Sequence, residues 1–438
     1  MMKREVYQQL LKWKNNNKKK PLLLQGARQV GKTFIVKEFG KKEYKNFYYF
    51  NFEQDENLHH FFKSQLLPEN IIENLSIYIG EKIEPDSSLI FFDEIQVLPE
   101  VLTSLKYFQE QAPQYNIISA GSLLGVSIAS HKSFPVGKVS FLTLYPMSFL
   151  EFLEAIEGSL LLEKIKKIDE SKPLNEVFHN KLISHLKLYL YIGGMPEAIQ
   201  DYIDNKDIAR VRKIQLDILE SYKRDFSKYN NSTQALKVSN IWHSVPYQLA
   251  KENKKFRYKD VKKNGRASFY ELSIEWLKNA GLINVAYNIS VPKMPLSGYA
   301  DKSKIKLYLF DTGLLGAMLN ISSKIIVDPN QLFIEYNGAF IENFVAQQLK
   351  VYLHSDLYYW TSKSDAEVDF LLQMNREIYP IEVKSGLSRN LKSLRSYESK
   401  YHPLKIYRLS PRNMMQDDTF VNIPLYAVHY FKQLIAND

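Results

Sequence analysis

The sequence contains no cysteine. This absence excludes disulfides, zinc–thiolate sites, iron–sulfur clusters and cysteine nucleophiles. Glycine and proline are scarce, at 17 each, which excludes collagen-like and low-complexity chains. No apolar run is long enough to span a membrane, and the charged N-terminal segment lacks the apolar centre of a secretory signal. We therefore expect a cytoplasmic globular protein without a membrane contact.

The chain is long and moderately basic. Its 438 residues correspond to about three domains at ordinary domain size. The 58 Lys and Arg exceed the 48 Asp and Glu, which gives a formal charge of +10. This excess favours a polyanionic partner such as a nucleotide or a nucleic acid. A solvated lysine-rich surface explains the same charge equally well.

The first third of the chain alternates short apolar runs with helical segments. Buried strands separated by helices indicate a parallel sheet with crossover helices. A helix is expected before the sheet, over residues 5–14. The predicted strands are residues 21–25, 46–52, 89–93, 116–120 and 138–144.

The pattern changes after residue 146. Helical periodicity dominates first, then helices precede a strand, and the last third contains a helix, three strands, a helix and a strand. No long flexible linker separates these parts, which indicates that they pack closely. We predict an α/β domain at 1–146, a helical lid at 147–230, a unit at 231–300 and a second α/β domain at 301–438.

A glycine-containing stretch between the strand at 21–25 and the next helix fits the phosphate-binding pattern GxxxxGK[ST]. Glycines let the backbone wrap closely around phosphate oxygens, and the helix adds the positive end of its dipole. Lys32 would reach the β- and γ-phosphates of ATP, and the Thr33 hydroxyl would bind Mg²⁺. The cofactor-binding stretch comprises Gly26, Ala27, Arg28, Gln29, Val30, Gly31, Lys32 and Thr33.

The apolar strand at 89–93 ends in two carboxylates, Asp93 and Glu94. Adjacent charges at the end of a buried strand are costly to desolvate without a cation. We predict that Asp93 holds Mg²⁺ and that Glu94 is the general base for the attacking water. A solvated strand end is the alternative. Ser122, after the next strand, is our candidate for a γ-phosphate sensor, with Ser119 behind it, although a plain turn serine fits equally well.

Six strings stand out along the chain: GARQVGKT, LIFFDE, IISAGS, FLTLYPMSFLEF, YIGGMPEA and KLYLFDTGLL. Together they resemble AAA-type ATPases of bacteria and archaea that carry a C-terminal domain of unknown function. The resemblance spans essentially the whole chain and implies ATP and Mg²⁺ as cofactors. Because many AAA-type ATPases form rings, it also leaves an oligomer open.

One position departs from this family. Gly137-Lys138 stands where family members often have Gly-Arg. Lysine cannot make the planar bidentate contact of an arginine finger. The source of any such finger is therefore not identified, and Arg224 is a weak substitute.

Residues 251–266 are strongly basic, with eight Lys and Arg against two acidic residues. Phe256 and Tyr258 are interleaved with these charges. A helix follows and ends near Gly281, as helices often end at glycine. Helix, basic turn, helix and strand hairpin resemble a winged helix, which would contact the DNA backbone. A solvated loop or a protein-packing winged helix is the open alternative.

Acidic residues recur in the C-terminal α/β part. Glu342 lies on a predicted helix, Asp369 on a strand, and Glu382 and Lys384 on one face of the following strand. Carboxylates suit Mg²⁺, and a lysine stabilises a nucleophilic water or the pentavalent phosphate. The arrangement resembles the PD-(D/E)XK nuclease fold, which implies metal binding by Glu342, Asp369 and Glu382 and catalysis by Asp369, Glu382 and Lys384. Glu367 is a second acidic candidate, and an ordinary Glu–Lys ion pair is the alternative.

The sequence thus predicts an α/β chain with a P-loop NTPase parallel sheet, a helical subdomain, a winged-helix-like unit and a restriction-endonuclease-like C-terminal domain. The expected function is Mg²⁺-dependent ATP hydrolysis coupled to the nuclease-like domain and acting on DNA. The alternative is a nucleotide-driven switch or scaffold whose nuclease-like domain is inactive and binds a protein partner. The sequence leaves both open, because one fold serves several activities.

Overall fold

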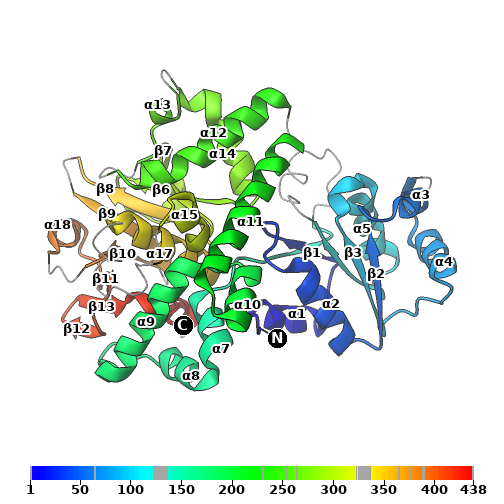
Figure 1. Cartoon of the computed structure of the whole chain (residues 1–438), viewed down its shortest axis with the longest axis horizontal. Coiled ribbons are helices and arrows are strands. Elements are labelled where there is room, and N and C mark those ends of the chain that lie inside the picture. Colours follow the sequence, from blue (N-terminus) through cyan, green and yellow to red (C-terminus); the bar gives the residue numbers. More distant parts are fainter. Residues whose placement is uncertain are drawn as a thin grey trace. The chain divides into compact units, whose positions relative to one another are not determined.

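Figure 1 shows the computed structural model of the chain, which forms two compact units. The N-terminal unit is Lys3–Tyr145 with Asn279–Gly281, and the C-terminal unit is Pro146–Lys278 with Leu282–Asp438. No helix in the described parts has both the length and the hydropathy to cross a membrane. The structure describes residues 2–63, 66–121, 137–228, 231–251, 255–262, 265–321, 323, 337–363, 366–374, 376–386 and 390–436.

A parallel sheet forms the centre of the N-terminal unit, as predicted. Its described strands are β1 (Leu22–Gln25), β2 (Asn46–Asn51), β3 (Ser88–Asp93), β4 (Asn116–Ala120) and β5 (Ser140–Thr143). They lie in the order β2-β3-β4-β1-β5, and every neighbouring pair is parallel. Strands β3 and β4 are buried along their whole length, because helices cover both faces of a parallel sheet.

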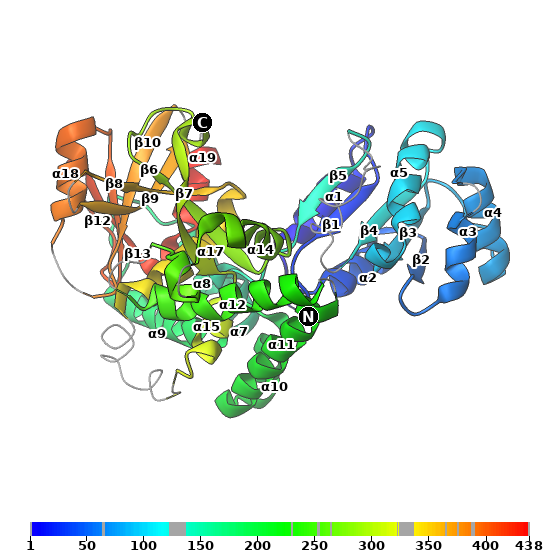
Figure 2. The same ribbon diagram turned by 90° about the horizontal axis from the view of Figure 1, so that it is seen from above.

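Helices pack on both sides of this sheet (Figure 2). Its described helices are α1 (Val6–Lys14), α2 (Lys32–Glu43), α3 (His60–Lys63), α4 (Pro68–Ile79) and α5 (Pro99–Gln111), with short 3₁₀ turns η1 (Glu56–His59) and η2 (Ile95–Val97). Ile90 and Phe92 of β3 join a hydrophobic core with residues of α4 and α5. Phe91 points to the opposite face, where α2 packs. The loop from β1 to α2 therefore lies at the carboxyl end of the strands.

The C-terminal unit contains a mixed sheet. Its described strands are β6 (Ile283–Ile289), β7 (Ala300–Leu309), β8 (Leu357–Thr361), β9 (Glu367–Met374), β10 (Glu377–Val383), β11 (Ile406–Ser410), β12 (Met415–Asp417) and β13 (Phe420–Pro424). Their order is β12-β13-β11-β10-β9-β8-β6-β7. The β6–β8, β10–β11 and β11–β13 pairs are parallel, and the others are antiparallel.

Helices surround this second sheet. The described ones are α7 (Phe149–Glu157), α8 (Ser159–Lys166), α9 (Glu176–Ile192), α10 (Pro196–Asn205), α11 (Ile208–Lys228), α12 (Ser232–Leu249), α13 (Tyr258–Val261), α14 (Ala267–Asn279), α15 (Thr312–Met318), α17 (Asn337–Leu353), α18 (Lys392–Tyr401) and α19 (Tyr430–Ala436), with 3₁₀ turns η3 (Leu296–Tyr299) and η4 (Leu425–Ala427). The order α17, β8, β9, β10, α18, β11 matches the predicted helix, three strands, helix and strand.

Two boundaries of the predicted domains differ from the structure. Residues 147–230, expected as a lid of the ATPase domain, cluster with the C-terminal sheet, because α9 and α11 pack on α15. The strand expected in the 231–300 unit is β6, which pairs with β7 and β8 in the same sheet. Backbone pairing across the 300/301 boundary thus joins the last two predicted parts.

Two glycine-containing segments of the C-terminal unit, around Gly193 and Gly313, lie next to the buried carboxylate of Asp311. Asp311 Oδ2 accepts a hydrogen bond from the Gly194 N–H at 2.6 Å, and Oδ1 accepts one from the Leu314 N–H at 2.9 Å. A Cβ on Gly193 would lie 2.3 Å from Asp311 Oδ1, and one on Gly313 would lie 2.4 Å from a backbone oxygen. Burial raises the pKa of Asp311 to about 6. The strings around residues 193 and 313 therefore need glycine because two backbone segments touch there.

The segment that enters the C-terminal unit is held at the same place. The Met147 N–H donates to the Gly194 carbonyl at 2.7 Å, and the Tyr189 hydroxyl donates to the Met147 carbonyl at 2.5 Å. Gln347 and Gln348 of α17 both donate to the Tyr189 oxygen. We call this buried network of Met147, Tyr189, Asp311, Gln347 and Gln348 the polar knot. It anchors the chain just after residue 145, where the N-terminal unit ends.

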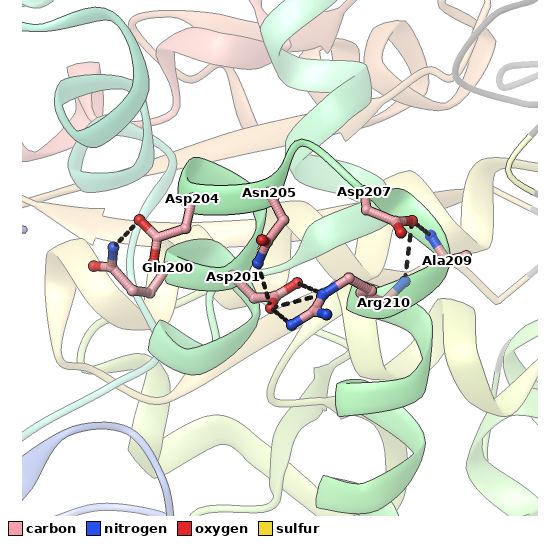
Figure 3. Close-up of polar contacts among 7 residues, drawn as sticks. All are labelled: Gln200, Asp201, Asp204, Asn205, Asp207, Ala209 and Arg210. Atoms are coloured by element: carbon pink, nitrogen blue, oxygen red, sulfur yellow. Dashed lines mark hydrogen bonds and ion pairs between the residues drawn. The ribbon is translucent and has the colours of Figure 1, made fainter.

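Hydrogen bonds on the surface shape the turn between α10 and α11 (Figure 3). Arg210 donates from Nη2 to Asp201 Oδ1 at 2.7 Å, and Asn205 donates to the same carboxylate. Asp207 caps α11 by accepting from the Ala209 N–H at 2.8 Å. These contacts are exposed, so they shape the turn and contribute little stability.

Candidate nucleotide-binding site and the C-terminal acidic cluster

The predicted phosphate-binding loop connects β1 to α2 and has an unusual backbone. Gly26 has φ +140°, and a Cβ there would lie 2.1 Å from the Leu144 carbonyl oxygen. Gly31 has φ +96° and is the N-cap of α2, while Gln29 has φ +61°. Positive φ values curl the loop back over the helix N-terminus, where unbonded N–H groups and the helix dipole favour an anion.

Lys32 lies folded over this loop. Its ammonium donates to the Gly26 carbonyl at 2.9 Å and to the Ala27 carbonyl at 2.7 Å, and the residue is 8% exposed. Burial lowers the pKa of Lys32 to about 8, although Glu94 and Asp93 oppose the shift. Its acceptors are neutral carbonyls, and a phosphate oxygen is a stronger acceptor for an ammonium. The contacts therefore hold Lys32 at the loop without fully neutralising it.

Thr33 and Asp93 meet where α2 begins and β3 ends. The Thr33 hydroxyl donates to Asp93 Oδ2 at 2.8 Å, and the Tyr49 hydroxyl donates to the same oxygen at 3.2 Å. Asp93 is 2% exposed, and burial raises its pKa. A hydroxyl and a carboxylate side by side are the oxygen ligands that Mg²⁺ takes next to a nucleotide. The residues present therefore fit a Mg²⁺–nucleotide complex.

Glu94 has a constrained backbone. Its φ of +54° is uncommon for a residue with a Cβ, and such strain is found at functional sites. The Gln96 amide donates to Glu94 Oε2 at 2.6 Å. A Cβ on Gly121 would lie 2.3 Å from Gln96 Oε1, so a larger residue there would require the Gln96 side chain to move. Glu94 is thereby held beside Asp93 at the same strand end.

Gln96 and Tyr49 were not among the predicted site residues. Gln96 positions Glu94, and Tyr49 contacts Asp93. The signal for Tyr49 was its place near the end of β2, since Asn51 and Asp93 are register partners on neighbouring strands. Gln96 follows Glu94 by two residues, but its contact depends on the turn formed by η2.

The remaining predicted residues of this unit contribute less. Ser122 lies outside the described residues. Ser119 is fully buried on β4, and its hydroxyl has no hydrogen-bond partner among the described residues. Lys138 pairs with Glu110 at 2.9 Å on the surface. Arg224, in the C-terminal unit, has a side chain 81% exposed.

The C-terminal acidic residues gather around a lysine that the sequence analysis did not single out. Lys306 of β7 is completely buried, and its ammonium lies 2.9 Å from Glu342 Oε1, 2.6 Å from Glu367 Oε1 and 3.9 Å from Asp369 Oδ1. The Tyr308 hydroxyl also donates to Glu342. We call these five residues the Lys306 cluster. It brings Glu342, Glu367 and Asp369 together, as the nuclease-like interpretation requires, but around an ammonium ion.

Glu382 and Lys384 pair with each other next to this cluster. Lys384 Nζ lies 2.5 Å from Glu382 Oε1, and Glu382 is 5% exposed. The neighbouring Val383 N–H donates to Asp369 Oδ2 at 2.7 Å. Strands β9 and β10 therefore place Asp369 beside the Glu-x-Lys segment, as predicted from the hairpin.

A metal ion does not fit the C-terminal cluster as it stands. No group of three or more acidic or histidine side chains within the described residues has metal-binding geometry. Each of the predicted ligands, Glu342, Asp369 and Glu382, has a lysine ammonium nearby. The structure therefore does not support the predicted metal site.

The basic segment is only partly available to a ligand. Phe256 is buried and packs edge-to-face on Tyr258, which stacks on Tyr270. These aromatic rings therefore hold α13 to α14 and are not platforms for bases. The exposed cations in the described part of this segment are Lys251, Arg257, Lys259, Lys262 and Arg266.

Three family models match separate parts of the chain. Residues 18–153 match the model described as "AAA domain". Residues 183–325 and 337–428 match two models of domains of unknown function, DUF8612 and DUF4143. Two mycobacterial proteins, the uncharacterized Mb2031c of Mycobacterium bovis and Rv2008c of Mycobacterium tuberculosis, are each 33% identical over 101 residues. The match covers 22% of this chain and 22% of each relative.

Solved structures show a weak likeness. The Walker-type ATPase PABY2304 of Pyrococcus abyssi is 14% identical with a TM-score of 0.44, covering 73% of this chain and 96% of that one. Cdc6p from Pyrobaculum aerophilum is 12% identical with a TM-score of 0.25, covering 74% and 94%. The match over residues 18–153, together with the loop geometry, supports a nucleotide-binding ATPase of the AAA type.

Proposed function

We propose that this chain is a Mg²⁺-dependent ATPase that works as a nucleotide-driven switch. The observation that carries the proposal is the arrangement of Lys32, Thr33 and Asp93 at the β1–α2 loop. Lys32 is buried over neutral carbonyls, and Thr33 and Asp93 form a ready oxygen pair. The match of residues 18–153 to an AAA domain points to the same chemistry.

Binding of ATP would exchange contacts that the loop already makes. The Lys32 ammonium would leave the Gly26 and Ala27 carbonyls for the β- and γ-phosphates. Thr33 and Asp93 would hold Mg²⁺, which neutralises charge on the phosphates. The loop N–H groups of residues 26–31 would bind phosphate oxygens.

Hydrolysis requires a base beside the γ-phosphate, and Glu94 is the candidate. Gln96 fixes the Glu94 carboxylate, and the strained backbone sets its direction. Glu94 would orient the attacking water and accept its proton. Because the chain continues from β5 directly into the polar knot at Met147, movement at the nucleotide would be passed to an anchored segment of the C-terminal unit.

The switch is favoured over the nuclease-coupled function by the Lys306 cluster, which does not fit a metal. DNA contact is a second candidate, supported by the exposed cations Arg257, Lys259 and Lys262. It predicts DNA binding that weakens steeply with added salt and is reduced uniformly across sequences when these residues are replaced by Ala.

The test is ATP turnover by the full chain with and without Mg²⁺. Glu94→Gln should reduce kcat about 10²-fold or more while ATP binding is retained, because only the base is lost. Glu73→Gln, an exposed acid on α4, is the matched control and should turn over ATP as the wild type does. Unchanged turnover in Glu94→Gln would remove Glu94 from the proposal, and absence of ATP binding in the wild type would overturn it.

A further inference from the structure

The Lys306 cluster is an unusual use of a buried charge. Lys306 reaches it from β7, Glu342 from α17, and Glu367 and Asp369 from β9, so three separate elements converge on one ammonium. The Lys306 side chain and the Glu342 side chain are both 0% exposed. The Tyr359 ring lies 4.9 Å from the same ammonium. A buried charge is tolerated only when it is paired. The Lys306 ammonium lies near three carboxylates, those of Glu342, Glu367 and Asp369.

The ammonium stays charged in this setting. Burial on its own would lower the pKa of Lys306, but Glu342, Glu367 and Asp369 outweigh burial and raise that pKa above its ordinary value. The same ammonium offsets part of the negative charge of the three carboxylates with a group of the chain itself. A divalent cation placed among them would face a fixed positive charge at close range in a medium of low dielectric constant.

The Glu382 side of the cluster offers no better place. Glu382 Oε1 is held by Lys384, and Asp369 Oδ2 accepts from the Val383 N–H. Glu382 Oε2 is buried and has no hydrogen-bond partner among the described residues. This oxygen could therefore accept a cation. Any ion bound to it and to Asp369 would be close to two ammonium groups, because Lys306 lies beside Asp369 and Lys384 beside Glu382.

We infer that Lys306 is a built-in counter-ion that takes the place of a divalent metal in the C-terminal unit. The unit keeps carboxylates arranged as a metal-dependent nuclease would have them but assembles no metal site, so it cleaves no phosphodiester by metal catalysis. The inference is independent of the proposed ATPase function, because neither ATP nor Lys32 enters into it.

The test is a titration of the nucleotide-free full chain with Mn²⁺, followed by electron paramagnetic resonance. Wild type, Asp369→Asn and Glu382→Gln should bind the same number of Mn²⁺ ions. A wild-type chain that binds one more Mn²⁺ than both variants would overturn the inference. So would Mn²⁺-dependent cleavage of labelled DNA by the wild type that Asp369→Asn abolishes.

Removing the ammonium gives the converse test. Lys306→Met should gain one Mn²⁺ per chain over the wild type, and the gain should disappear in Lys306→Met with Asp369→Asn. A folded Lys306→Met chain that gains no Mn²⁺ would contradict the inference, because the ammonium would not be what excludes the metal. If Lys306→Met does not fold, the comparison of wild type with Asp369→Asn and Glu382→Gln still decides. Failure of ATP turnover has no influence on any of these results.

Discussion

Two buried lysines of this chain lie near carboxylates, yet their pKa values are shifted in opposite directions. Lys32 rests on the neutral carbonyls of Gly26 and Ala27, and burial lowers its pKa to about 8. Lys306 is paired to Glu342 and Glu367, and despite burial its pKa is raised. The Lys32 ammonium has neutral hydrogen-bond acceptors that a phosphate could replace. The Lys306 ammonium is instead paired with carboxylates.

The difference shows that residue type and burial do not decide what a lysine does. The acceptors decide it. Neutral carbonyls offset little of the charge of Lys32, which leaves it available to an incoming anion. Carboxylates offset the charge of Lys306 much more strongly. We therefore expect Lys32 to matter for ligand binding and Lys306 for stability.

Lys306→Met should cause the largest loss of stability. Removing the ammonium takes away the cation that lies beside Glu342, Glu367 and Asp369, which should reduce the free energy of unfolding by about 3–5 kcal/mol. Lys304→Met, two residues earlier on β7 at an exposed pair with Asp301, is the control and should cost less than about 1 kcal/mol. Equal losses in urea unfolding would show that the cluster is not electrostatically special.

Lys32→Met should act on ATP and leave folding largely intact. Loss of a preorganised charged donor should weaken ATP binding or turnover about 10²- to 10³-fold. Calorimetric titration with ATP and a turnover assay would measure it. Lys42→Ala, an exposed lysine on the same helix α2, should bind ATP like the wild type. A Lys32→Met chain with normal ATP affinity would contradict the nucleotide site.

Gly193→Ala and Gly158→Ala form a matched pair that tests the polar knot. Gly193 has φ +78° and ψ −165°, and Gly158 has φ +79° and ψ −162°, so the backbone strain of the alanine is shared. Only at Gly193 would the new Cβ collide, at 2.3 Å from Asp311 Oδ1, while at Gly158 nothing lies within 4 Å. Thermal unfolding should show an additional loss of about 1–3 kcal/mol for Gly193→Ala. Similar values would mean that the knot relaxes freely.

Over a single pH unit the smallest predicted effect is the pH dependence of ATP binding, at about 1.4 kcal/mol. Above pH 8 the nucleotide-free chain loses the proton of Lys32, and it has to regain that proton to bind phosphate. The ATP dissociation constant should therefore rise about tenfold per pH unit above pH 8, until the pKa of the bound state is reached. Affinity measured from pH 7 to pH 10 checks this. A slope that persists in Lys32→Met would assign the titration to another group.

Sequence reasoning predicted the N-terminal unit well because its information is local. The five apolar runs became β1 to β5, and Lys32, Thr33 and Asp93 meet as expected at adjacent ends of β3 and α2. The contact of Gln96 with Glu94 could not be predicted, because it depends on the turn formed by η2.

The C-terminal unit was less predictable because its contacts are distant in sequence. Asp369 and Glu382 could be placed from a hairpin, but Lys306 lies 36 residues before Glu342, and no local pattern indicates that β7 lies beside α17. The predicted metal site did not take into account the Lys306 ammonium, which lies among its carboxylates. The contact between the segments around Gly193 and Asp311 likewise could not be predicted, because only the fold brings them together.

The most direct measurement is the number of Mn²⁺ ions bound per chain with and without ATP, in Glu94→Gln so that ATP is not consumed. We predict one Mn²⁺ that requires ATP and disappears in the added Thr33→Ala variant, and none that depends on Asp369. Absence of an ATP-dependent ion would contradict the nucleotide site. An ATP-independent ion that is lost with Asp369→Asn would contradict the role assigned to Lys306.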